Sequence, residues 1–178
     1  MQDLSLHILD IAENSINADA KNIVIRIVED SKKDALIIEI IDDGKGMNPE
    51  FKEKVIDPFV TTRTTRRVGL GLPLLKAAAE LANGKLTIES APGTGTIVTA
   101  TFQLSHIDRK PIGNMADTIL TLAVGNPDVN LRYVRKHDGR EFIFDTKSFL
   151  KNLNGSRKNF TAALSEMKNY LKENSEII

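Results

Sequence analysis

The chain has 178 residues, with 24 basic and 24 acidic side chains and a hydrophobic share of 41%. This length suits one domain with a full core, and the hydrophobic share excludes a disordered chain. The balanced charge provides no field that would draw the protein to nucleic acid or to an anionic membrane, so we expect neither as a partner. The absence of cysteine excludes disulfides and zinc–thiolate sites.

The sequence predicts no targeting or membrane-spanning segment. Residues 1–5 lack the basic start and the apolar run of a signal peptide. No apolar stretch is long enough to cross a bilayer. We therefore expect a soluble, cytoplasmic protein.

The first predicted element is a helix that Asp3 or Ser5 caps and that runs to about Asn17. Residues at helical spacing predict which face of it is buried. These residues are Leu4, Ile8, Ile11, Ala12 and Ser15.

Two strands are predicted next, over residues 23–28 and 36–41, and they form a hairpin that ends at Asp42. The second strand is almost wholly apolar, which predicts a central place in its sheet. A short helix then starts at Asn48-Pro49, where proline at an early position costs no hydrogen bond.

Residues 57–68 are polar, rich in threonine and arginine and without periodicity, which predicts a mobile loop. A helix follows over 70–82. Strands over 85–90 and 96–104 are joined by the turn 91–95. We place the end of a first domain, residues 1–105, just after these strands.

The remaining residues, 106–178, are predicted to form a C-terminal helix–hairpin–helix extension that packs on the first domain or docks from it. A linker over 106–113 leads to a helix over 114–124. The Asp138-Gly139 pair between two β-rich runs is a strong hairpin signal. An amphipathic helix over 160–171 ends the pattern, and the sequence assigns the extension no role.

The first candidate site residues lie on the N-terminal helix. His7, Asp10 and Asn14 share one face of it. Asn14 offers a neutral amide oxygen suited to Mg²⁺, and Asp10 can orient water or accept a hydroxyl proton. A solvated helix face explains the same residues, and Asn14 alone does not decide between the two interpretations.

A second candidate motif follows the apolar strand and runs from Asp42 through Gly44 and Gly46 to Met47. A carboxylate at a strand end can accept a hydrogen bond from the exocyclic amine of adenine. Glycines beside it let the backbone approach a flat base. An ordinary turn between a strand and a helix uses the same residue types.

A third motif, Gly69-Leu70-Gly71-Leu72, opens a helix whose N–H groups and dipole favour an anion. Before it, the loop containing Thr61, Thr62 and Arg63 carries guanidinium groups suited to phosphate oxygens, in a segment that could close over a nucleotide. Two structural interpretations explain the same residues without a ligand. They are an ordinary helix start and a solvated basic loop.

Together these motifs resemble the GHKL (Bergerat-fold) ATPase superfamily over residues 4–104. The resemblance implies an α/β (α+β) fold, a two-layer sandwich of a mixed, mainly antiparallel sheet with helices on one face. It implies ATP and Mg²⁺ as ligands, with Asn14 holding the metal and Asp42 binding adenine. It also matches Gly44, Gly46, Gly69 and Gly71 to the family's glycines and places Thr96, in a fourth motif with Gly93 and Gly95, near the adenine.

Three departures from relatives bear on function. Histidine kinases carry a phospho-accepting helical hairpin before this domain, whereas the first helix here begins almost at residue 1, and the first strand of many kinase domains is missing too. In gyrase-like and anti-sigma relatives a glutamate base precedes the magnesium asparagine by four residues, and here that residue is Asp10.

Three functions remain in view. The first is a stand-alone protein kinase or kinase-like regulator in signal transduction, which transfers the γ-phosphate of ATP to an unidentified protein partner in trans. The second is a nucleotide-gated protein-binding module with slow or no hydrolysis. A DNA-acting ATPase is disfavoured by neutral charge and small size, and a homodimer through an apolar face of residues 106–178 stays open.

Overall fold

The structure is a computed structural model that describes residues 2–56, 71–153 and 160–175. The loop predicted over 57–68 lies outside the described residues, and so do five of the predicted site residues. These five are Thr61, Thr62, Arg63, Gly69 and Leu70.

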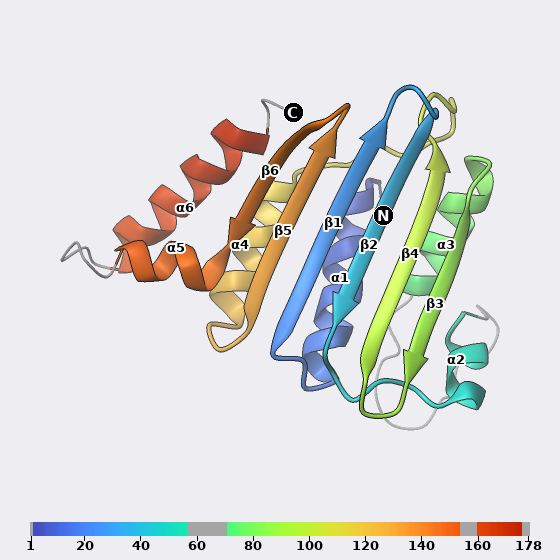
Figure 1. Cartoon of the computed structure of the whole chain (residues 1–178), viewed down its shortest axis with the longest axis horizontal. Coiled ribbons are helices and arrows are strands. Elements are labelled where there is room, and N and C mark those ends of the chain that lie inside the picture. The colour runs from blue at the N-terminus through green and yellow to red at the C-terminus, as the bar shows by residue number, and fades with distance from the viewer. Residues whose placement is uncertain (1, 57–70, 154–159, 176–178) are drawn as a thin grey trace.

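The described chain forms one six-stranded sheet in the order β3-β4-β2-β1-β5-β6 (Figure 1). All neighbouring strands are antiparallel except β1 and β5, which are parallel. The strands are β1 Asn22–Asp30, β2 Ala35–Asp42, β3 Lys85–Ala91, β4 Gly95–Gln103, β5 Asn130–His137 and β6 Arg140–Asp145. The mixed, mainly antiparallel sheet that we predicted is confirmed, and β2 is central as expected.

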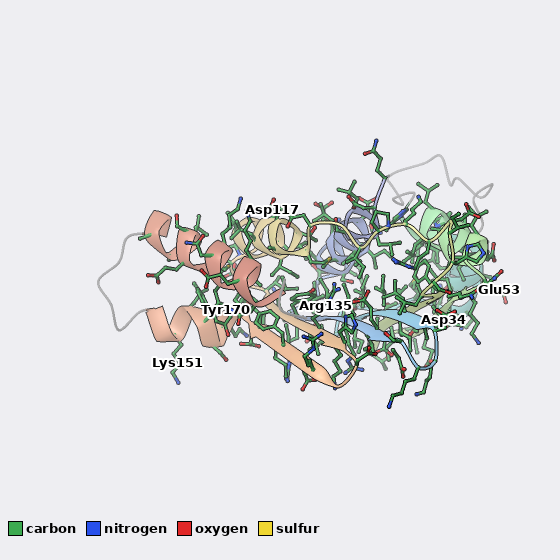
Figure 2. All side chains as sticks on the ribbon, turned by 90° about the horizontal axis from the view of Figure 1, so that it is seen from above. Asp34, Glu53, Asp117, Arg135, Lys151 and Tyr170 are labelled. Carbon is green, nitrogen blue, oxygen red and sulfur yellow. The ribbon has the colours of Figure 1, made fainter. Side chains whose placement is uncertain are left out.

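Helices α1, α3 and α4 form a layer on one side of this sheet, α6 lies beside α4, and α5 follows the end of β6 (Figures 1 and 2). The opposite face of the sheet carries no helix among the described residues. The helices are α1 Leu4–Asn17, α2 Pro49–Val55, α3 Gly71–Leu81, α4 Met115–Gly125, α5 Thr146–Leu153 and α6 Phe160–Ser175. None of these helices is both long and apolar enough to cross a membrane.

The core lies between the sheet and the helix layer. On β2 every second side chain is buried, with Leu36, Ile38 and Ile40 facing the helices. The predicted stripe of α1 packs against them, and all five of its residues are buried. Asp3 caps this helix by accepting a hydrogen bond from the N–H of Leu6.

The C-terminal half of the chain joins the same sheet, because β5 pairs with β1 from Asn22 to Glu29. Residues 106–113, predicted as a linker, also dock on α1, where the N–H groups of Leu4 and Ser5 donate to the carbonyls of Pro111 and Ile112. The predicted helix, hairpin and last helix of this segment are present. Helix α5 was not predicted; it starts where the Asp145 carboxylate accepts a hydrogen bond from the N–H of Ser148.

Candidate functional site

The end of β2 holds a buried carboxylate in a fixed orientation. Asp42 is 9% exposed, and its Oδ2 accepts a 2.6 Å hydrogen bond from the hydroxyl of Ser15 on α1. Its Oδ1 accepts a 2.9 Å hydrogen bond from the N–H of Gly44. A carboxylate has about four acceptor positions, so these two donors orient Asp42 without using all its capacity.

Two glycines let the segments around Asp42 approach closely. Gly46 has φ +66°, and a Cβ there would lie 2.0 Å from the carbonyl oxygen of Ala91. Gly95 has φ +89°, and a Cβ there would lie 1.9 Å from the carbonyl oxygen of Asp42. Both positions therefore require glycine for conformation and for space.

A hydroxyl network joins the loop after β2 to the β3–β4 hairpin. Thr96 is the β4 neighbour of Asp42 in the sheet, and its hydroxyl lies 2.9 Å from that of Ser90. Ser90 accepts a hydrogen bond from the N–H of Met47. The predicted residues Asp42, Met47 and Thr96 thus meet at one end of the sheet, although they come from three different segments.

Asp43, next to Asp42, has a different environment. Its carboxylate accepts hydrogen bonds from the N–H of Lys21 and from the N–H and side-chain amide of Asn22. The hydrogen bond from the Asn22 amide is the main reason that the pKa of Asp43 lies below its ordinary value. Asp43 therefore fixes the loop to the start of β1, which leaves Asp42 as the carboxylate that faces α1.

Asp10 contacts the start of α3. A Cβ added to Gly71 would lie 2.8 Å from the Cβ of Asp10, so this glycine lets the two helices meet. Gly71 and Leu72 are both buried, and Leu72 packs in the hydrophobic core. The N-terminal end of the described part of α3 therefore lies against Asp10.

His7, one turn before Asp10, is fully buried. Its Nε2 lies 3.5 Å from the Nζ of Lys110. Burial lowers the pKa of His7 to about 4, and the Lys110 ammonium adds to this effect. The imidazole is therefore neutral at physiological pH and belongs to the packing between α1 and residues 106–113.

Asn14 directly precedes Ser15 and is half-buried. Its side chain makes no hydrogen bond to another described residue. No three carboxylate or imidazole side chains gather as a metal-binding cluster in the described part of the chain. A cation near this turn would thus depend on the Asn14 amide oxygen and on oxygens from a ligand.

The structure also reveals partners that sequence reasoning missed. Ser15 was predicted only as a buried residue, and Ser90 was not singled out. A serine on an otherwise apolar helix stripe was the available signal for Ser15. The signal for Ser90 was weak, because serine at a strand end is common.

The comparison with protein families matches residues 2–106 to "Histidine kinase-, DNA gyrase B-, and HSP90-like ATPase". A "Putative sensor histidine kinase NtrY-like" of Rickettsia felis is 31% identical over 110 residues, which cover 62% of this chain and 18% of that protein. "Sporulation kinase D" of Bacillus subtilis is 31% identical over 98 residues, which cover 55% of this chain and 19% of that protein. The chain thus spans less than a fifth of the length of these curated relatives.

Two solved structures share the fold at low sequence identity. The Aquifex aeolicus MutL ATPase domain, solved with ADP, has a TM-score of 0.52 at 18% identity and covers 94% of this chain and 69% of its own. The N-terminal domain of a DNA repair protein has a TM-score of 0.54 at 15% identity and covers 80% of this chain and 52% of its own. The family match spans more than half of the chain, so the chain belongs to the histidine kinase-, DNA gyrase B- and HSP90-like ATPases, the superfamily that its motifs resemble.

Proposed function

We propose that the chain binds ATP with Mg²⁺ at the Asp42 end of the sheet and transfers the γ-phosphoryl group to a separate protein. The observation that carries the proposal is the buried Asp42 carboxylate, held by Ser15 and Gly44 beside the α1 turn that contains Asn14. Membership of an ATPase family supports the nucleotide, and similarity to histidine kinases supports the transfer.

The residues present fit an adenine nucleotide. Asp42 keeps acceptor capacity for an exocyclic amine, Gly44 and Thr96 lie next to it, and Gly46 lies in the loop that follows. Gly44 and Gly46 let the loop after β2 pack closely against the backbone of Ala18 and Ala91, which holds this loop beside Asp42. These residues would hold the base, while the start of α3 at Gly71 and Leu72 would face the phosphates.

Asn14 and Asp10 would carry the phosphate chemistry. Asn14 would give its amide oxygen to Mg²⁺, a hard cation that prefers oxygen ligands and bridges phosphate oxygens. Asp10 would accept the proton that the acceptor group loses as it bonds to phosphorus and the bond to ADP breaks. The contact between Asp10 and Gly71 supports this role, because it brings the carboxylate to the helix start assigned to the phosphates.

A nucleotide-gated binding module is the second candidate. The observation in its favour is that residues 111 and 112 satisfy the first N–H groups of α1, the helix that carries Asp10 and Asn14. The C-terminal half of the chain is therefore tied directly to a helix of the site. In such a module, nucleotide binding would change a partner surface with slow hydrolysis or none.

Incubation with γ-labelled ATP, Mg²⁺ and candidate acceptor proteins separates the two functions. Label on a protein supports the kinase, and nucleotide binding without label or released phosphate supports the module. Asp42→Asn should abolish nucleotide binding, whereas Asp10→Asn should keep binding and lose transfer. Asp43→Asn is the matched control, because the Asp43 carboxylate accepts its hydrogen bonds from Lys21 and Asn22, on the side away from the Ser15–Asp42 contact. Unchanged nucleotide affinity in Asp42→Asn would refute the site.

A further inference from the structure

The sheet has two edges in the described part of the chain, and they differ in character. β3 exposes the polar side chains of Lys85, Thr87 and Glu89, which protect an edge from pairing. β6 has three apolar residues in a row at its centre, Phe142, Ile143 and Phe144, and Ile143 is 42% exposed. No proline or glycine interrupts β6, so its edge is suited to pairing with another strand.

The hairpin geometry determines which backbone groups of β6 point outward. Asp138 and Gly139 have φ of +46° and +88°, as in a type I′ turn, which makes His137 and Arg140 a hydrogen-bonded pair. Because hydrogen-bonded and non-hydrogen-bonded pairs alternate, the N–H and C=O groups of β6 that point away from β5 belong to every second residue. These residues are Glu141, Ile143 and Asp145.

Two observations support this alternation. The alternation predicts that the N–H of Leu131 on β5 points toward β6. This N–H donates a hydrogen bond to the hydroxyl of Thr146, the residue that follows β6. Among the described residues, Ile143 makes no backbone hydrogen bond to an element other than its neighbour β5. The outward groups at the centre of β6 therefore remain open to a further strand.

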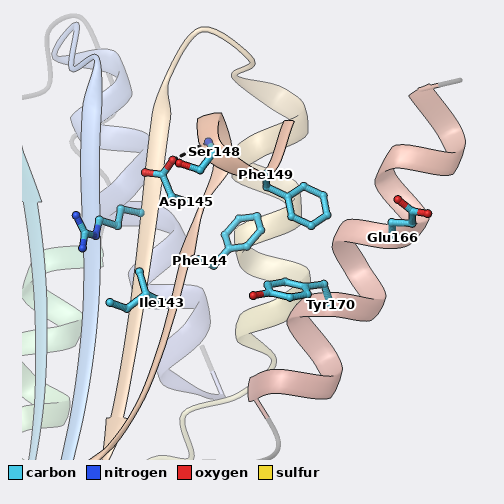
Figure 3. Close-up of a pocket in the computed structure, with 8 residues that line it drawn as sticks. Ile143, Phe144, Asp145, Ser148, Phe149, Glu166 and Tyr170 are labelled. Atoms are coloured by element: carbon cyan, nitrogen blue, oxygen red, sulfur yellow. Dashed lines mark hydrogen bonds between the residues drawn. The ribbon is translucent and has the colours of Figure 1, made fainter. Parts of the chain in front are cut away.

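A groove lies beside this edge, between β6, α5 and α6 (Figure 3). It has a volume of about 730 Å³. Tyr170 and Phe149 form its aromatic wall, with ring centroids 5.7 Å apart, and Phe144 lies 5.4 Å from Phe149. Tyr170 is 41% exposed, so an apolar side chain on an added strand would gain contact area here.

The charges on the bare face of the sheet indicate what such a strand would carry. The β5 side chains on this face are Arg132, Val134 and Lys136. Their partners on β6 are, in the same order, Asp145, Ile143 and Glu141. Basic residues on β5 thus lie opposite acidic residues on β6, and Lys136 and Glu141 form an ion pair at 2.7 Å. If the next strand continued this change of charge from strand to strand, it would place basic residues beside Asp145 and Glu141 and an apolar residue beside Ile143.

A second copy of the chain fits this edge poorly. Antiparallel pairing of two β6 strands about Ile143 would place Glu141 of each copy directly opposite Asp145 of the other. Like charges directly opposite each other in a sheet are destabilising. The row of charges thus favours a basic partner over self-pairing.

We propose that the β6 edge binds an extended segment of a partner protein in which two basic residues flank three apolar ones. The segment adds a seventh strand to the sheet. Its basic residues and central apolar residue face Asp145, Glu141 and Ile143, and its other two apolar residues enter the groove beside Tyr170 and Phe149. This surface lies apart from the Asp42 site and does not depend on the proposed function.

The test uses the full chain and a fluorescent, end-blocked peptide with the sequence Ser-Lys-Leu-Val-Leu-Lys-Ser, measured by anisotropy. Replacement of both lysines by glutamate should weaken binding about tenfold or more, since two favourable cross-strand pairs become unfavourable. Glu141→Lys should reduce this preference for the basic peptide. Glu89→Lys, on the β3 edge, is the matched control and should leave it unchanged.

Two N-methylated peptides test the backbone without altering the protein. A methyl group on the valine nitrogen and one on the neighbouring leucine nitrogen block opposite edges of the peptide, so one of the two should lose binding and the other should keep it. Hydrogen exchange should slow at Ile143. Equal binding of the lysine and glutamate peptides, tolerance of both methyl groups, or no binding overturns the proposal. Self-association that Ile143→Pro abolishes also overturns it, in favour of pairing between copies.

Discussion

The Ser15 hydroxyl donates a 2.6 Å hydrogen bond to Oδ2 of Asp42, and this contact joins α1 to the end of β2. Both side chains are buried, so the bond is protected from competing water. It therefore aligns the carboxylate on which the proposed nucleotide site depends.

Ser15→Ala should destabilise the fold by about 2 kcal/mol, because the hydroxyl bonds to a buried charged group. It should also weaken ADP binding, since Asp42 loses one of the two donors that orient it. Urea denaturation and calorimetric titration measure the two effects. Thr87→Ala, at an exposed position on β3, should change neither, and unaltered ADP affinity in Ser15→Ala would argue against the orienting role.

Gly46→Ala should be strongly destabilising, by more than about 2 kcal/mol, because it combines a positive φ with a clash against the Ala91 carbonyl. Gly93→Ala, in the neighbouring turn, is the control. It also has a positive φ, but no atom lies within 4 Å of an added Cβ. Its cost should be limited to about 1 kcal/mol of backbone strain. Thermal and urea denaturation measure the stability of both variants. Equal losses of stability in Gly46→Ala and Gly93→Ala would contradict the steric argument.

His7 should make stability depend on pH. Its pKa is about 4 in the folded chain, against an ordinary value of 6.5, so the unfolded chain binds the proton first as pH falls. Stability is therefore complete above pH 6.5 and should drop by about 2 kcal/mol between pH 7.5 and pH 5 from this residue. Urea denaturation across this range should show a flatter profile in His7→Gln than in the unaltered chain. A similar slope in both proteins would remove His7 as the cause.

The Arg135–Glu29 ion pair joins β5 to β1 at 2.6 Å, with side chains 13% and 11% exposed. Arg135→Met should reduce the free energy of unfolding by about 3 kcal/mol, since the mostly buried Glu29 loses its 2.6 Å ion pair and keeps only the longer 3.6 Å approach of the His137 ring. Arg26→Met breaks the Arg26–Glu39 pair, whose side chains are 42% and 25% exposed, and should cost under about 1 kcal/mol. Adding Glu29→Gln to Arg135→Met should recover part of the loss in chemical denaturation. Similar losses of unfolding free energy in Arg135→Met and Arg26→Met would show that burial does not determine how much each ion pair stabilises the fold.

A chain ended after residue 105 tests whether the first predicted domain folds alone. It would lack β5, the parallel neighbour of β1, and the carbonyls of Pro111 and Ile112 that cap α1. We expect it to aggregate or to unfold at a lower urea concentration than the full chain, because β1 would become an apolar edge. Static light scattering and urea denaturation measure this. A stable monomer would establish residues 1–105 as an independent unit.

The sequence alone predicted most local structure, because local signals carry it. The apolar stripe of α1, the strand predicted over 23–28, the apolar run over 36–41 and the Asp138-Gly139 turn all matched the observed elements. Helix α5 was missed because its start depends on one side chain, Asp145, at the end of a strand. The site residues were also named from short motifs, though their roles remain predictions.

Only the tertiary structure decided which distant groups meet. No local pattern predicts that Ser15 bonds to Asp42, that Asp10 contacts Gly71, or that residues 111 and 112 cap α1. The same holds for β5, which a hairpin signal predicts as a strand but which lies parallel to β1 in the main sheet. Local conformation follows from neighbouring residues, whereas these contacts depend on how the helices and strands pack together to bury their apolar faces.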